Sequence, residues 1–475
     1  MNSATVSETD ASEPQAPAAS WAIFRIASVA VFLVSMDSTL LFAAFGAIGK
    51  SFPQTSAADM SWVLNAYSVV YAAMLIPAGG LADAHGRKRV FLLGVAVFLA
   101  ASAACGLAPN VPLLVAARVL QAAGAALLTP ASLSIVLDAF PPAKRAVAVS
   151  LWGAVGGLAA AVGPSLGAFI IETLGWPWAF YLNLPLGAWS IWRGARLLRE
   201  AQKPHSPRAL DAVGMALLMT GVGALALAIV QSESPRWTTS ELACTGLLGI
   251  IALLAFIGWT RVAAAPLVDP KLFKHPTYTF VNLATLVFGA AFAMMFFAFF
   301  FYLTRVWHYP LLRAGLAITP GPLLVIPFAI LSGRVAARSG HRPFLVGGAL
   351  LYACSGLWFL LMPGETPSYL AHWLPGLVLS GVSIGLLLPS LSAAAVNRLP
   401  AEHYAVGSAV NQATRQVGSV LGVAVTVLLL GYSDLTHATF VPLYLCHITL
   451  ALLTASLCLP VNTRPAVRLR GSTNL

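Results

Sequence analysis

The chain has 475 residues, of which 59% are hydrophobic and only 9% charged, and its mean hydropathy is +0.83. This composition excludes an ordinary soluble domain and indicates a membrane protein. The formal net charge of +11 could suit a nucleic-acid partner, but the basic residues lie mostly between apolar stretches, where they set orientation in a membrane, so we expect no nucleic-acid partner.

The first twenty residues contain three acidic residues, no basic residue and several Ala, Ser and Pro, so we expect a disordered cytoplasmic tail over 1–20. Apolar stretches then recur, each long enough to cross a hydrocarbon core of about 30 Å as a helix. The fourteen predicted spans are 21–48, 58–82, 89–107, 111–138, 144–171, 176–194, 211–231, 241–260, 277–303, 312–336, 343–362, 369–396, 405–432 and 437–460. The five cysteines have no paired short spacing, so we predict neither a metal site nor a cofactor.

The basic residues alternate between the two sides of these spans. If the N-terminus is cytoplasmic, 21 of the 27 Lys and Arg residues fall on the cytoplasmic side. The positive-inside rule therefore predicts a multi-pass protein of the inner (plasma) membrane with both termini inside, including a tail over 461–475.

Two segments about 254 positions apart resemble each other: "GGLADAHGRKRVFLLG" from Gly79 and "GRVAARSGHRPFLVGG" from Gly333. Such a repeat indicates a duplicated helical bundle, whose substrate path lies between the copies near the middle of the membrane. We expect an all-α membrane protein with six-helix bundles over 21–195 and 276–460, and two extra spans with their linkers over 196–275. A transporter becomes the leading interpretation.

The charged turn after the second predicted span carries a recognisable pattern. Its residues match the loop between helices 2 and 3 of the major facilitator superfamily, G-x-L-a-D-r-x-G-r-k, which the chain therefore resembles. The resemblance implies that these residues form a cytoplasmic latch between the two bundles. The matching latch residues are Gly79, Asp83, Gly86, Arg87 and Lys88.

The fourth and fifth predicted spans extend the resemblance. "LLVAARVLQAAGAALLTP" is similar to the family's fourth helix through Arg118 and Gln121; an arginine in an apolar helix is costly, so it is expected to face the interior and find a partner. "AVGPSLGAFI" resembles the antiporter element of the fifth helix through Gly163, Pro164 and Gly167, although two of its usual glycines are alanines here. The resemblance implies a hinge, and tight packing alone is the alternative.

Two further stretches, "MDSTLL" around Asp37 and "WPWAFYLNLPLG" from Trp176, resemble the fourteen-span drug:proton antiporter family, which also has two extra central helices. Asp37 is the one acidic residue that we place deep within a span. Burial favours its neutral form and a cation such as Arg118 favours its charged form, so helix movement or substrate entry could change its protonation. We predict that Asp37 and Arg118 couple the protein to protons. The alternative is an Asp37 bound permanently to a neighbouring side chain.

A substrate cavity needs polar or aromatic side chains within the spans. The aromatic ninth span supplies two candidates, although we expect most of its aromatic side chains to face lipid. Because the second half has no additional acid in its spans, we expect neutral, anionic or at most monovalent substrates. The cavity candidates are Asn65, Tyr67, Gln121, Phe297, Phe301, Asn411, Gln412 and Arg415.

Together these patterns predict a monomeric, proton-coupled antiporter that exports small hydrophobic or amphipathic compounds by alternating access, as multidrug efflux proteins do, and not an enzyme. A dedicated exporter or a proton symporter of a single metabolite is the alternative within transporters. From another class, a membrane sensor or enzyme would need a catalytic cluster or a signalling domain, and the sequence contains neither.

Overall fold

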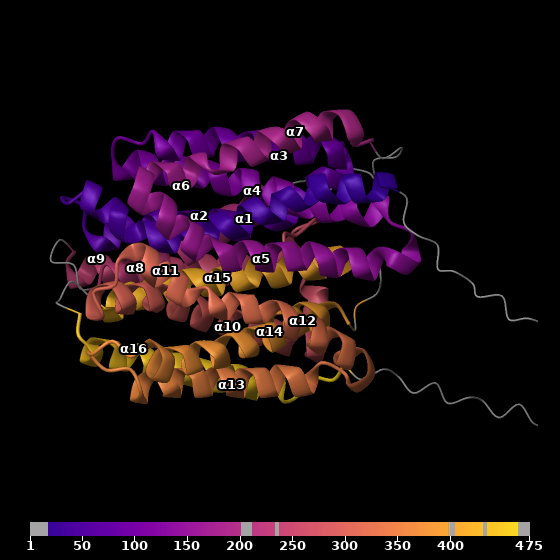
Figure 1. Ribbon diagram of the computed structural model, residues 1–475. Coiled ribbons are helices and arrows are strands. Elements are labelled where there is room, and N and C mark those ends of the chain that lie inside the picture. Colours follow the sequence, from indigo (N-terminus) through magenta and orange to yellow (C-terminus); the bar gives the residue numbers. More distant parts are fainter. Residues whose placement is uncertain are drawn as a thin grey trace, which may run out of the picture.

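The computed structural model describes residues 18–200, 211–232, 237–397, 399, 404–430 and 435–463, and the regular elements within these ranges are helical. The expected N-terminal tail, apart from its last three residues, and most of the C-terminal one fall outside them. Figure 1 shows the indigo-to-magenta helices gathered in one half and most of the orange and yellow helices in the other.

The first half is built from long helices that lie roughly side by side. Their ends carry local signals: Asn110 caps one helix through its side-chain oxygen, which accepts from the Leu113 N–H at 3.0 Å, and Gly86, with φ +100°, makes the tight turn between two others. The elements are α1 (Ala18–Ser51), α2 (Ala57–His85), α3 (Arg87–Gly106), α4 (Val111–Ala139), α5 (Pro142–Leu174), α6 (Pro177–Tyr181) and α7 (Asn183–Leu197).

Two helices, α8 (Ala212–Val230) and α9 (Thr239–Val262), follow and pack against each other. Helix α8 also contacts α2 of the first half and α15 of the second. Helix α9 begins with a capping box between Thr238 and Glu241. Both helices fall within 196–275, the range for which the sequence predicts two extra spans.

The second half repeats the pattern, with Gly340, at φ +80°, in the place of Gly86. Its elements are η1 (Pro270–Lys274), α10 (Pro276–Phe301), η2 (Tyr302–Val306), α11 (Leu311–Ile318), α12 (Pro320–Ser339), α13 (Arg342–Leu361), η3 (Tyr369–Trp373), α14 (Leu374–Val396), α15 (Tyr404–Leu430) and α16 (His437–Cys458).

Three helix pairs make the main contacts at the boundary between the halves. Helix α2 packs against α15, and α5 packs against α11 and α12; in Figure 1, α5, α8, α11 and α15 follow this boundary. Polar side chains on α2 and α15 therefore lie where a transporter of two bundles would carry its substrate path.

Within the described residues, twelve helical segments are long and apolar enough to cross a membrane. They correspond to twelve of the fourteen predicted spans. The two others are the span predicted over 58–82, which lies in α2, and the span predicted over 176–194, which divides into α6 and α7. The chain is an all-helical, multi-pass membrane protein.

Candidate functional site

The centre of the first half holds a buried ion pair. Asp37, well inside α1, accepts from Arg118 of α4, with 2.6 Å between Oδ2 and Nη1. Their side chains are only 3% and 1% exposed. The two residues predicted to form the coupling site are thus in direct contact.

Further helices satisfy the remaining atoms of this pair. The Arg118 Nε donates to the Val63 carbonyl of α2 at 3.1 Å, and Gln121 Nε2 donates to the second Asp37 oxygen at 2.9 Å. Ser102 of α3 accepts from Gln121 at 2.8 Å and from Asn183 of α7 at 2.9 Å. A buried carboxylate and guanidinium need such partners, because unmet hydrogen bonds in a low-dielectric interior are costly.

Gln121 therefore belongs to the charge network and is fully buried there. Ser102 and Asn183 were not predicted. They come from helices distant in sequence, and a lone serine in an apolar span has no distinguishing pattern. Asn183 lies in the stretch "WPWAFYLNLPLG", whose resemblance to the drug:proton antiporter family is the signal that could have found it.

Two stacked tyrosines of α2 connect this network to the boundary. The Arg118 guanidinium lies 4.1 Å from the centre of the Tyr67 ring, a cation–π contact. Tyr67 stacks on Tyr71, with 5.9 Å between ring centres and 16° between planes. The Tyr71 hydroxyl donates to Thr129 of α4 at 3.2 Å. Asn65 is also buried, and its amide donates to Ser61 within α2 at 3.4 Å.

The α15 candidates divide into two groups. Asn411 is buried and donates to Asn282 and Thr285 of α10, at 3.2 and 2.9 Å. Gln412 and Arg415 are only partly buried. Gln412 lies within hydrogen-bonding reach of the Tyr71 hydroxyl, and the Arg415 guanidinium is near enough to act on that hydroxyl electrostatically.

The expectation that most aromatic side chains of the ninth predicted span face lipid is wrong. Four closely spaced phenylalanines of α10 are at most 5% exposed. The reason is that α10 packs on other helices on several sides and fills its surroundings with rings. These residues are Phe296, Phe297, Phe299 and Phe300.

The two cavity candidates of α10, Phe297 and Phe301, contact each other with ring centres 4.9 Å apart and ring planes tilted by 50°. Phe297 also meets Phe42 and Phe45 of α1, at 5.7 and 5.1 Å between ring centres. They form an aromatic contact between the halves.

The glycines of the α5 element allow helices to approach closely. A Cβ on Gly163 would meet the Thr39 side chain of α1, and one on Gly167 would meet Leu40. On the other side of α5, Gly315 of α11 lies against the backbone carbonyl of Pro164. The element thus packs α5 on both halves, and the hinge role stays a prediction.

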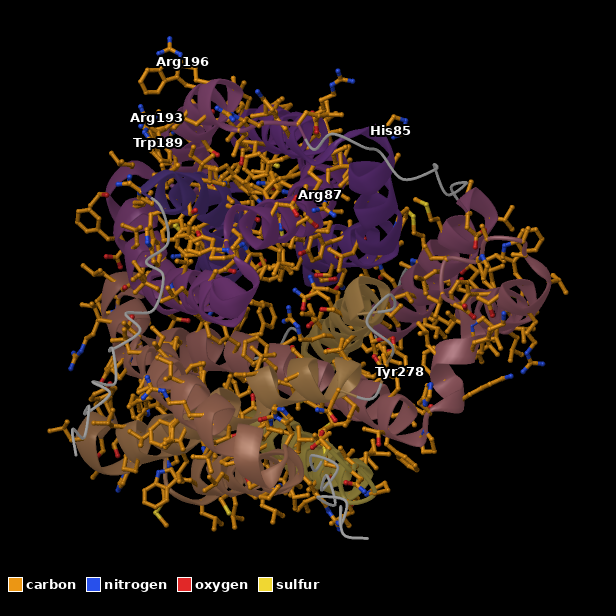
Figure 2. The ribbon with its side chains drawn as sticks, turned by 90° about the vertical axis from the view of Figure 1, so that its right-hand side faces the viewer. His85, Arg87, Trp189, Arg193, Arg196 and Tyr278 are labelled. Carbon is orange, nitrogen blue, oxygen red and sulfur yellow. The ribbon has the colours of Figure 1, made fainter. Side chains whose placement is uncertain are left out.

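The charged turn between α2 and α3 is bound within the first half. Arg87 pairs with Asp138 at the end of α4, with 2.5 Å between Nη1 and Oδ2. Lys88 donates its backbone N–H to Glu200 at 3.2 Å and its ammonium to the Ala195 carbonyl at 2.8 Å. Figure 2 views the molecule from this end, with His85 and Arg87 labelled. The Asp83 side chain lies outside the described part, and Gly79 packs near Pro130.

A surface pocket of about 140 Å³ lies between α1 and α7, near Trp189 and Arg193, which Figure 2 labels, and is remote from Asp37. Among the described residues, no group of three His, Cys, Asp or Glu side chains could hold a metal ion.

Two helical bundles with polar groups at their boundary define a solute transporter of the two-bundle class. The Major Facilitator Superfamily model matches residues 27–423. The chain belongs to that superfamily.

Several proteins of the same kind are similar in sequence. "Multidrug resistance protein Stp" of Mycobacterium tuberculosis (strain CDC 1551 / Oshkosh) is 32% identical over 83% of this chain and 73% of its own. "Tetracenomycin C resistance and export protein" of Streptomyces glaucescens is 32% identical over 85% and 75%. "Multidrug export protein EmrB" of Escherichia coli (strain K12) is 28% identical over 84% and 78%.

Solved structures support the fold. A peptide transporter POT in complex with sulfate superimposes with a TM-score of 0.66 at 20% identity, over 93% of this chain and 94% of its own. A D-xylose-proton symporter gives 0.65 at 13% identity, over 94% and 98%.

Proposed function

We propose that the chain is a proton-coupled antiporter that exports small hydrophobic or amphipathic compounds across the plasma membrane by alternating access. The names of the relatives, which describe multidrug resistance and export, support drug efflux. The observation that carries proton coupling is the buried Asp37–Arg118 pair, with its 2.6 Å contact between helices α1 and α4.

The proposed cycle follows from the electrostatics of this pair. A proton that reaches Asp37 from outside neutralises the carboxylate and weakens its attraction for Arg118, which keeps the Val63 carbonyl and the Tyr67 ring. The altered contact between α1 and α4 favours rocking of the two halves, the proton leaves on the inside, and substrate binding favours the return. One proton moving down about 100 mV supplies roughly 2.3 kcal/mol.

The topology that we propose has fourteen crossings with both ends inside. Helix α2, with 29 residues, is about 43 Å long and exceeds the hydrocarbon thickness. The α6–α7 pair would make the other additional crossing. The basic turn at Arg87 and Lys88 then faces the cytoplasm, in accord with the positive-inside rule.

A dedicated exporter of one metabolite is the second candidate. The observation that favours it is the relative named for the export of a single compound, tetracenomycin C. Transport assays with a chemically varied panel separate the two, since a dedicated exporter would accept one scaffold only.

The test uses the purified protein in liposomes, with Asp37→Asn as the variant. The wild type should accumulate a substrate against its gradient when a pH gradient is imposed, and Asp37→Asn should lose this accumulation while still exchanging labelled for unlabelled substrate. Glu241→Gln removes an exposed acid at the start of α9 and should leave the coupling intact. Proton-driven accumulation by Asp37→Asn at the wild-type level would refute the proposed coupling site.

A further inference from the structure

We propose that Arg415 of α15 binds an acidic group of the transported compound, so that the preferred substrates are organic anions, such as aromatic carboxylates, with an apolar body. The proposal rests on the transport function proposed above and names the substrate class.

Arg415 lies on a polar stripe near the middle of α15, a helix of 27 residues. Residues three and four positions apart share a helix face. The members of the stripe are partly exposed, whereas Asn411 and Val410 beside it are buried. The stripe consists of Gln412, Arg415, Gln416 and Ser419.

Gln412 and Arg415 of this stripe lie toward α2 of the first half, against which α15 packs. The Ser419 hydroxyl instead donates to the Gly289 carbonyl of α10, in the second half, at 3.5 Å. Gln412 and Arg415 both act on the hydroxyl of Tyr71, which is near the middle of α2 and is itself fixed by its bond to Thr129. Arg415 therefore lies at the boundary between the halves, at the depth where transporters of this architecture hold their substrate.

The charge of Arg415 has no counterion among the described residues: no carboxylate lies within 4.0 Å of its guanidinium, and its electrostatic neighbour is the neutral phenol of Tyr71. Charged side chains within a membrane normally pair or line a water-filled cavity. A carboxylate of the substrate supplies the missing charge, and its two oxygens match the planar fork of a guanidinium.

Apolar and aromatic surfaces next to Arg415 suit the rest of such a molecule. Tyr67 and Tyr71 stack at this boundary, and Val69 of α2 lies with Val420 and Ala424 of α15 in one apolar cluster. These side chains are buried in this conformation, so they meet the apolar body of the substrate when α2 and α15 move apart in the transport cycle. Burial of apolar substrate area here supplies affinity, while Arg415 supplies discrimination.

The same tyrosine stack separates Arg415 from the charge network around Asp37. Tyr67 contacts Arg118, and Tyr71 contacts the α15 stripe. The anion and the proton consequently occupy different sites, so binding of the acid can be measured independently of proton coupling.

The test compares two probes that share one apolar body, pyrenebutyric acid and its uncharged methyl ester, by fluorescence titration of purified protein. A charge-assisted hydrogen bond contributes enough that the acid should bind about tenfold or more tightly than the ester. Arg415→Gln should remove this preference, and Arg415→Lys should keep part of it. Arg313→Gln removes an exposed arginine that lies over Tyr309 and should preserve the preference.

Equal binding of acid and ester by the wild type would overturn the proposal without any variant, and so would an unchanged preference in a folded Arg415→Gln. Either result would leave the proton-driven accumulation assay, and with it the proposed antiport, untouched. Acid-selective binding by the wild type, together with wild-type accumulation by Asp37→Asn, would support the anion site at Arg415 and refute the proposed coupling site at Asp37.

Discussion

Arg118 and Arg415, two arginines well inside long apolar helices, have opposite surroundings. Arg118 is 1% exposed and is held by a carboxylate, an amide, a backbone carbonyl and an aromatic ring. Arg415 is partly exposed and has a tyrosine hydroxyl as its electrostatic neighbour. Arginine is thus fully paired in the network of the first half and lacks a counterion among the described residues at the boundary. The surroundings of the side chain, not the residue type, indicate its role.

The largest expected effect that tests this comparison is on stability. Arg118→Gln would leave the Asp37 carboxylate buried without its cation, and breaking a buried pair in this way costs about 3–5 kcal/mol. Thermal unfolding in detergent should show a large fall in the midpoint. The double variant Asp37→Asn/Arg118→Gln removes both charges and should recover much of the loss; equal losses in the single and double variants would contradict the pairing.

The second effect concerns the packing that positions Asp37. Gly163→Ala in α5 would push against Thr39, two residues from Asp37 on α1, and overpacking of this kind costs about 1–3 kcal/mol. Gly153→Ala, on the same helix with nothing within 4 Å of a new Cβ, should be neutral or stabilising by up to about 1 kcal/mol. Unfolding midpoints and proton-driven accumulation should therefore fall in the first variant only.

A third and smaller effect is expected at Arg415 in the absence of substrate. Arg415→Gln orphans no carboxylate, and Tyr71 keeps its bond to Thr129, so the free energy of unfolding should change by less than about 1 kcal/mol. Unfolding of the substrate-free protein measures this directly. A loss of unfolding free energy as large as that of Arg118→Gln would mean that Arg415 has a structural partner. The surroundings of Arg118 and Arg415 would then not differ in the way described.

The smallest effect lies in the repeated glycine turn, where His341 of the second half aligns with Arg87 of the first. Burial lowers the pKa of His341, which is outside the membrane-spanning segments. As the pH falls, the unfolded chain therefore takes up a proton on this imidazole before the folded chain does. The contribution of His341 to stability is present above a pH of about 6.5 and is lost as the pH falls below it.

His341→Gln should consequently flatten the pH dependence of unfolding between about pH 5 and 7. Arg87 stays charged over this range, so Arg87→Gln should leave the slope unchanged. If the free energy of unfolding changed with pH equally in the wild type and in His341→Gln, the burial of the His341 ring would be contradicted.

Much of the fold followed from the sequence because long apolar stretches and the repeated glycine turns have direct physical meaning. The Asp37–Arg118 pair could be predicted because charges are rare in apolar helices and need partners. Ser102 and Glu200 could not, since their roles depend on which distant helices meet. The burial of the α10 phenylalanines was missed because a helix that is apolar on every face gives no signal of which face meets lipid.

Across the boundary, Gly315 of α11 lies against the Pro164 carbonyl and the Ala168 side chain of α5, whereas Gly163 and Gly167 receive Thr39 and Leu40 of α1 within the first half. A contact between a glycine and a backbone carbonyl has no protruding side chain, so if the halves rock as proposed, α5 and α11 can slide past each other by part of a turn without first separating. A bulkier side chain in place of Gly315 would therefore slow transport by introducing a barrier at this contact.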